Sequence, residues 1–340
     1  MKFWGMSRAT AKFRLFPAAF WLVGSCSGLW AAVDGVVMNA TTGKPQASIT
    51  VNLIQPSAKG MQTLGSVKTD EQGKFKIDKD WPPGPALVQA TYQGATYTLA
   101  MTPGSPTSGV ELKIYDSTNK AGTAPVAEDM MLIEPGPEAT LVSETLLIQN
   151  KTNLTYADPA KGSTQFYVPA AGADKIRVTI NPPGGMPLQR PAQKTDQAGI
   201  YKVNYPLSPG ETRIDVDYAL PKGADGANTI SGKGIHPGSP LRLVTPASVT
   251  LSGPGITAVG QEPQSQARIY SVSGPEFEAK VEGTGSLRNP QGDAQQEEDN
   301  GAPQVAEESA RVYSQLAWVL GLTFGILLLG GVWLYRRGAA

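Results

Sequence analysis

Short stretches in which apolar and polar residues alternate recur along most of the chain. Residues 48–53 alternate strictly, and within 212–220 the residues Ile214, Val216 and Tyr218 alternate with two aspartates, which is the pattern of a strand with one buried face. Glycine- and proline-rich turns separate such stretches. The pattern predicts a mainly β fold, with strands at 33–38, 48–53, 74–77, 86–92, 96–99, 212–220, 241–244, 248–251, 267–272 and 277–281.

The N-terminal residues have the layout of a secretory signal peptide. An apolar stretch at 15–23 follows a basic start that holds Lys2, Arg8, Lys12 and Arg14. We therefore expect residues 1–32 to direct export and to be removed. Cys26 follows Leu-Val-Gly-Ser and resembles the acylated cysteine of bacterial lipoproteins, so lipidation at this position is an open alternative.

Residues 313–335 are uncharged and long enough to cross a bilayer as one helix. Trp318 and Trp333 lie near its two ends, as interfacial aromatic residues do, and two arginines follow directly. The positive-inside rule then puts the tail, residues 336–340, in the cytoplasm. We expect a single-pass protein of the bacterial cytoplasmic (inner) membrane, held in the lipid bilayer, with a periplasmic or extracellular ectodomain.

The predicted membrane helix also carries a stripe of small residues. The stripe consists of Ala317, Gly321 and Gly325, which are spaced four residues apart. Because small side chains let two helix backbones approach closely, this stripe is a candidate helix-packing contact.

Composition narrows the classes of function. The chain has 29 Lys+Arg against 29 Asp+Glu, so it lacks the basic excess of a nucleic-acid-binding protein, and we expect no nucleic-acid partner. Cys26 is the only cysteine, so no disulfide can form within the chain. Packed sheets must therefore supply the stability of the ectodomain.

A set of motifs in the first half of the ectodomain resembles a known family. The motifs are Gly35-x-Val37, Gly43-x-Pro45, Val51-x-Leu53, Thr69-Asp70-x-x-Gly73-x-Phe75, and Tyr92 with Gly94 and Tyr97. In this order they resemble the carboxypeptidase regulatory-like domain, which implies a transthyretin-like β-sandwich at 33–116. The resemblance implies no peptidase activity, because the sequence has no zinc-peptidase motif.

Residues 68–76 have a counterpart at 194–202. Both read Lys-Thr-Asp, then a glycine and an aromatic residue, and we expect a hairpin turn at 69–73. The self-similarity predicts a second sandwich, transthyretin- or immunoglobulin-like, at 125–221, with coincidence of two similar turns as the alternative. The expected fold class is therefore tandem β-sandwiches plus one C-terminal transmembrane helix.

Two further segments follow the second predicted sandwich. Residues 230–282 hold additional strands, which would either complete that sandwich or form a small third domain. In residues 283–312 apolar content falls and Gln, Glu, Asp, Gly and Pro dominate. We expect this second segment to be a flexible polar stalk.

Candidate catalytic chemistry is sparse. His236 is the only histidine, and its glycine- and proline-rich surroundings predict an exposed loop residue. Asp215 and Asp217 alternate with apolar residues, so we expect both on the solvent face of a sheet edge and not as an acid–base pair. We predict no catalytic residue, no cofactor and no metal ion, and hence a non-enzymatic protein.

Three functions of different classes follow from these expectations. The first is a scaffold whose sandwiches bind another envelope protein. The second is binding of cell-wall glycan, for which Trp81, Tyr92 and Tyr97 form a candidate aromatic platform, although the tyrosines could equally pack the sandwich. The third is a hydrolase with an unrecognised site.

Overall fold

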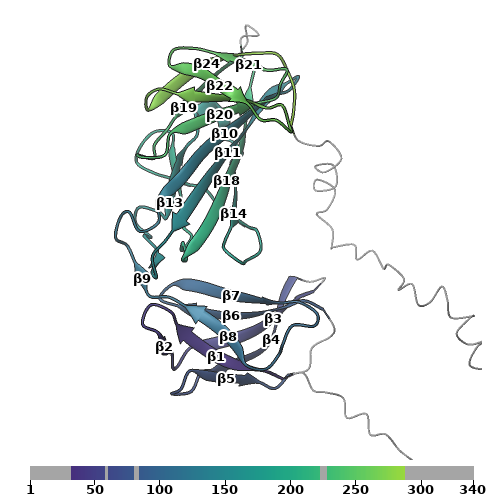
Figure 1. Ribbon diagram of the computed structural model, residues 1–340, viewed down its shortest axis with the longest axis vertical. Coiled ribbons are helices and arrows are strands. Elements are labelled where there is room, and N and C mark those ends of the chain that lie inside the picture. Colours follow the sequence, from purple (N-terminus) through teal and green to yellow (C-terminus); the bar gives the residue numbers. More distant parts are fainter. Residues whose placement is uncertain (1–31, 58–59, 80–83, 223–227, 288–340) are drawn as a thin grey trace, which may run out of the picture.

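The computed structural model describes residues 32–57, 60–79, 84–222 and 228–287, and it shows two β units one above the other (Figure 1). Strands dominate these residues, which confirms the prediction of a mainly β fold. No helix in the described ranges is long and apolar enough to cross a membrane. All of the predicted signal peptide except Ala32, together with Trp81 and the predicted membrane helix with Ala317, Gly321 and Gly325, lies outside them.

The first unit consists of two sheets that enclose one apolar core. In one sheet β1 (Val33–Asn39) pairs with β2 (Lys44–Pro45), β5 (Lys74–Ile77) and, in parallel, β8 (Val110–Ile114). The other sheet has the order β4 (Gly60–Lys68), β3 (Thr50–Ser57), β6 (Ala86–Tyr92), β7 (Ala95–Met101). Because alternate side chains point inward, Val37, Val51 and Val88 are fully buried between the sheets.

The second unit is built on one eight-stranded sheet. Its order is β15 (Leu188–Arg190), β14 (Arg177–Asn181), β18 (Gly210–Pro221), β11 (Ala139–Asn150), β10 (Val126–Pro135), β20 (Leu241–Thr245), β23 (Arg268–Val272), β22 (Ile256–Gln261). Two smaller sheets share its core: β13 (Thr164–Tyr167), β17 (Ile200–Val203), β16 (Gln193–Lys194), and β19 (Thr229–Lys233), β24 (Glu276–Glu282), β21 (Thr250–Ser252).

Among the strands after residue 228, β20, β22 and β23 belong to the eight-stranded sheet, and β19, β21 and β24 form a smaller sheet that shares its core. β20 pairs in parallel with β10, and residues from β19 to β24 lie in one buried cluster with those of β11 and β18. Leu146 and Ile214, which face each other on β11 and β18, are fully buried in that cluster. Burial of each such side chain contributes roughly 1.5–3 kcal/mol.

The turn at 69–73 differs from the predicted hairpin. β4 pairs with β3, whereas β5 pairs with β1 in the opposite sheet, so this segment crosses between sheets. The Asp70 carboxylate accepts hydrogen bonds from the backbone N–H groups of Gln72 and Lys74, at 2.9 and 2.8 Å. The matching segment at 195–199 does join two paired strands, β16 and β17. Similar turn sequences therefore make different connections.

A short strand pairing and nearby side-chain hydrogen bonds connect the two units. β9 (Ser117–Thr118), just after the first unit, pairs in parallel with β12 (Thr155–Tyr156) of the second. Beside this pairing, the Thr41 hydroxyl donates to the Asn153 carbonyl at 2.6 Å, and the Tyr97 and Thr155 hydroxyls lie 2.8 Å apart. The connection is thus a set of direct hydrogen bonds in addition to the linking chain.

Candidate functional site

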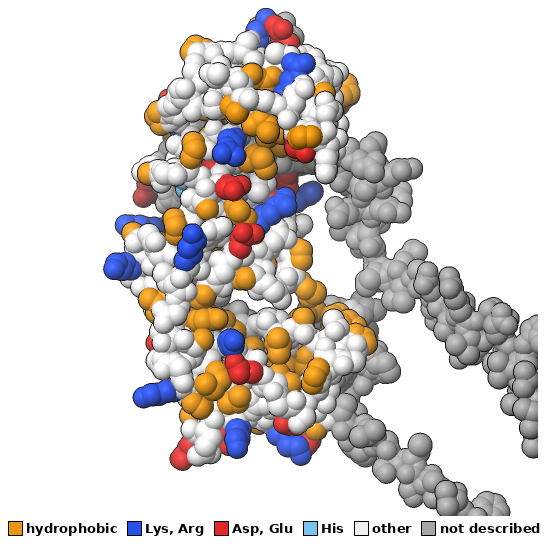
Figure 2. All heavy atoms as spheres, in the orientation of Figure 1, with side chains coloured by type: hydrophobic (Ala, Val, Ile, Leu, Met, Phe, Trp, Pro, Cys, Tyr) orange, Lys and Arg blue, Asp and Glu red, His pale blue; other side chains and the backbone are white. Residues whose placement is uncertain are grey.

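A groove of about 370 Å³ lies between the two units, and we name it the interdomain groove. Figure 2 shows hydrophobic side chains exposed in the region where the units meet. The first unit contributes Met61, Leu87, Gln89, Thr96, Tyr97, Thr98, Ala100, Lys113 and Tyr115. The second unit contributes Pro182, Pro183, Gly184, Gly185, Met186, Leu188, Tyr205, Ser208 and Pro209.

One wall of the interdomain groove is the outer face of β6 and β7, beside an open sheet edge. β7 is the last strand of its sheet, and its other side pairs with no strand in the described part of the chain. Thr96, Thr98 and Ala100 are alternate residues of β7 that line the groove. An unpaired edge offers a row of backbone N–H and C=O groups to an added strand.

Two large apolar side chains in the interdomain groove are exposed to solvent. Met61 is 54% exposed and Met186 is 52% exposed. They come from different units, Met61 from β4 and Met186 from the loop between β14 and β15. Methionine is flexible and polarisable, and it is common on surfaces that bind varied apolar partners.

The predicted glycan platform is not a set of exposed rings in the described residues. Tyr97 is only 6% exposed; its hydroxyl donates to the Tyr115 carbonyl at 2.8 Å, and its ring lies against that of Tyr115. Tyr92 is half-buried and its hydroxyl donates to the Asp116 carboxylate at 3.1 Å. Both tyrosines therefore pack and anchor the first unit, and glycan binding stays a prediction.

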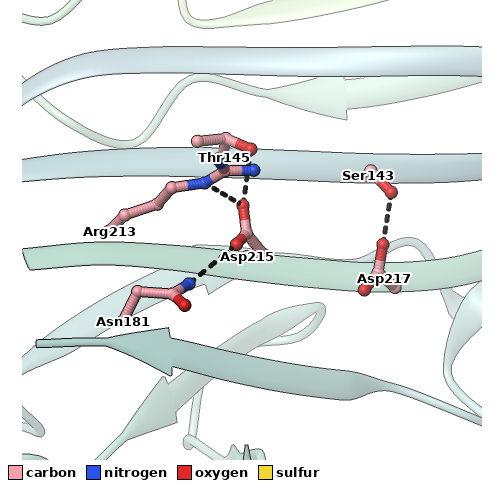
Figure 3. A network of polar contacts seen from close by, with 6 residues as sticks. All are labelled: Ser143, Thr145, Asn181, Arg213, Asp215 and Asp217. Atoms are coloured by element: carbon pink, nitrogen blue, oxygen red, sulfur yellow. Dashed lines mark hydrogen bonds and ion pairs between the residues drawn. The ribbon is translucent and has the colours of Figure 1, made fainter. Parts of the chain in front are cut away.

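Asp215 and Asp217 lie on the outer face of the eight-stranded sheet, as predicted, but not at an edge (Figure 3). Their strand, β18, is inside the sheet between β11 and β14. Asp215 accepts hydrogen bonds from Thr145 at 2.7 Å, Asn181 at 3.1 Å and Arg213 at 2.8 Å. Two cross-strand donors and Arg213 of the same strand thus satisfy its charge, which is a structural role.

His236 is not the exposed loop residue that the sequence predicts. It is partly buried, and no hydrogen-bond partner in the described structure meets its Nε2 atom. Burial lowers the pKa of His236, against the opposite effect of a hydrogen bond with the Gln165 backbone. Packing of the segment before β20 against β13 accounts for the difference, because it removes the imidazole from water.

Three buried carboxyl groups escaped prediction, and two of them, Asp129 and Glu144, interact. Asp129 on β10 is 2% exposed and Glu144 on β11 is 1% exposed. Burial raises the pKa of Asp129 to about 7, against the opposite effect of the neighbouring Glu144 carboxyl group. Burial, followed by the charge of Asp129, raises the pKa of Glu144 well above its usual range. The alternation of β11 carries the missed signal, since Val142, Glu144 and Leu146 share the inward face.

The carboxyl pair sits among core residues and not in an open site. Neither group forms an ion pair with a described Lys, Arg or His, and the buried hydroxyl of Tyr218 is the further titratable group that Glu144 affects. No group of three metal-ligating side chains occurs among the described residues. Chemically, the pair can bind and release a proton, and its ionisation in the core lowers the stability of the fold.

Comparisons with known proteins identify no family. No protein-family model matches the sequence, and no curated protein matches it. Among solved structures, an M1 zinc metallopeptidase from Deinococcus radiodurans is 15% identical over 46% of this chain and 42% of that chain, with a TM-score of 0.26. A mutant two-domain M1 zinc metallopeptidase bound to L-tryptophan gives 15% identity, 48% and 44% coverage and the same TM-score. This chain thus spans under half of their length, and a likeness at this level carries no argument about fold or activity.

Proposed function

We propose that this protein is a non-enzymatic interaction module of the bacterial envelope, exported and held in the cytoplasmic membrane by residues 313–335. Its tandem sandwiches, the first of carboxypeptidase regulatory-like type, present the interdomain groove to a protein partner. The exposure of Met61 and Met186 on facing walls of that groove is the observation that carries the proposal. Contiguous exposed apolar surface is typical of binding sites.

The open edge of β7 favours an extended segment as the bound element. Such a segment would add a strand beside β7, where main-chain hydrogen bonds give affinity. Its alternate side chains would then meet the apolar groove residues, which give specificity. The hydrogen bonds between the units support this role, because they hold both walls in place before binding and so reduce the entropy cost of association.

Photo-crosslinking in living cells tests the proposal. A photoreactive phenylalanine analogue is placed at Met61, at Met186 and, as a matched control, at Val259. Val259 is 66% exposed and apolar, but it lies on β22 at the far edge of the eight-stranded sheet. We expect Met61 and Met186 to give the same protein adduct and Val259 to give none of it. Equal adducts at all three positions, or glycan adducts alone, would contradict the proposal.

A further inference from the structure

A second groove, of about 680 Å³, lies on the second unit, and we name it the basic groove. Lys175, Arg177 and Arg190 line it around an apolar floor that includes Leu141 and Ala219. Arg177 is on β14 and Arg190 on β15, while Leu141 and Ala219 face each other on β11 and β18. The groove therefore combines the outer surface of the sheet with cationic side chains near the sheet edge.

The three cationic side chains of the basic groove have no charged partner among the described residues. No ion pair or hydrogen bond joins the Lys175, Arg177 or Arg190 side chain to another described residue, and all three residues are exposed. Asp217 is the carboxylate among the lining residues, and it accepts a hydrogen bond from Ser143. An anionic ligand would therefore find cations that are accessible and fixed to one surface.

The described chain ends at the rim of the basic groove. The backbone N–H of Leu287 donates to the Glu134 carboxylate at 2.6 Å, and the Gly285 N–H donates to the Pro135 carbonyl at 3.1 Å. A small pocket at this point is lined by residues 284–286 and by Leu141, which also lines the basic groove. The chain therefore leaves the second unit next to the groove.

The sequence that follows is strongly acidic. No Lys or Arg occurs between Arg288 and Arg311, whereas this interval holds Asp293, Glu297, Glu298, Asp299, Glu307 and Glu308. Residues 293–299 are six to twelve positions after Leu287, a reach of roughly 20–40 Å when extended. Arg177 is two strands from Leu141, about 10 Å at ordinary strand spacing. The carboxylates can therefore reach the groove easily.

We propose that residues 293–299 dock in the basic groove of the same molecule. The negative partners of Lys175, Arg177 and Arg190 are then the carboxylates of Asp293, Glu297, Glu298 and Asp299. The short connection to the groove gives these carboxylates a high local concentration, so that no separate partner molecule is needed. Docking folds the start of the polar segment back along the sheet, so that it shortens the connection between the folded units and the membrane helix. Salt weakens it, because the paired charges are at the surface.

Disulfide trapping in the detergent-solubilised full chain tests this docking. Gln189→Cys places a thiol in the basic groove and Gln296→Cys places one among the carboxylates, in a Cys26→Ser background. With oxidised glutathione as oxidant in 50 mM NaCl, we expect an intramolecular disulfide. We expect it to form at least tenfold faster than in the same chain with Lys175→Glu, Arg177→Glu and Arg190→Glu. In 500 mM NaCl the difference should disappear.

A charge swap separates docking from chance encounter. Adding Glu297→Lys, Glu298→Lys and Asp299→Lys to the groove-reversed chain should restore the fast rate, because the pairing is recovered with the signs exchanged. Equal rates with the native and reversed groove, or no recovery on the swap, would overturn the proposal. Disulfide-linked dimers in place of the intramolecular product would overturn it too, since the segment would then bind a second copy.

Discussion

At the residue scale, Asp129 and Glu144 make the second unit sensitive to pH. Their pKa values are raised in the folded state, so between about pH 4 and pH 7 the folded protein binds more protons than the unfolded chain. The free energy of unfolding therefore falls as pH rises through this window. The contribution of Asp129 is complete below about pH 4 and is lost as pH rises through about 7.

Calorimetry on single variants checks this prediction. We expect the melting temperature of the second unit to be lower at pH 8 than at pH 5. Glu144→Gln keeps the size of the side chain and removes one carboxyl, so it should reduce that difference, while the part due to burial of Asp129 stays. Met131→Leu changes the neighbouring core position without a titratable group and should leave the difference intact. The same pH difference in Glu144→Gln as in the native protein would show that the pair is not its source.

At the element scale, Gly35 sets the contact between β1 and β8. A Cβ atom at Gly35 would lie 2.0 Å from the Val110 carbonyl oxygen, which is backbone of the paired strand and cannot move alone. We expect Gly35→Ala to destabilise the first unit by about 2–4 kcal/mol, measured by urea unfolding. Gly260→Ala has open space around it and should change stability by less than about 0.5 kcal/mol. Equal effects of the two substitutions would refute the close-approach argument.

Many individual strands could be predicted, but their pairing could not. Alternation placed the strands at 33–38 and 74–77 within a residue of β1 and β5, because turns and apolar periodicity are local. It missed β10 and β11, the strands at the centre of the large sheet, since Asp129, Glu134 and Glu144 interrupt their apolar pattern. The parallel pairing of β20 with β10 joins residues over a hundred positions apart and leaves no local trace.

The candidate sites were less predictable than the strands. The interdomain groove depends on how two units face each other, and Met61 and Met186 have nothing in their own neighbourhoods that marks them as partners. Tyr97 appeared as a surface ring because its strand is near a turn, but alternation puts it on the inward face with Ala90. The burial of Tyr97 could thus be predicted from periodicity, whereas the interdomain groove could not be predicted without the arrangement of both units.

At the scale of the whole molecule, Asp116 ties the linker to the first unit. Its carboxylate accepts hydrogen bonds from Asn39 at 2.8 Å and Tyr92 at 3.1 Å, and its backbone N–H donates to Thr41 at 2.9 Å. Asp116→Ala leaves the buried Asn39 amide without this acceptor. We expect the two units then to sample a wider range of orientations.

Spin-label distances between the units measure that change. Labels at Glu71→Cys and Asp196→Cys, both exposed, in a Cys26→Ser background report one distance from each unit to the other. The distance distribution should be narrow in the native chain, broader in Asp116→Ala and again narrow in Asp116→Asn, which keeps an acceptor oxygen. An unchanged width in Asp116→Ala would mean that the β9–β12 pairing alone fixes the units.

The affinity of the full-length protein for the partner captured at Met61 and Met186 tests the account most directly. Met61→Lys with Met186→Lys puts two charges on the walls of the interdomain groove, and Val259→Lys puts one on an equally exposed apolar position of β22. We predict that the double variant weakens binding at least tenfold, about 1.4 kcal/mol, and that Val259→Lys stays within twofold of the native protein. Native affinity in the double variant, or an equal loss in Val259→Lys, would contradict the groove as the binding site.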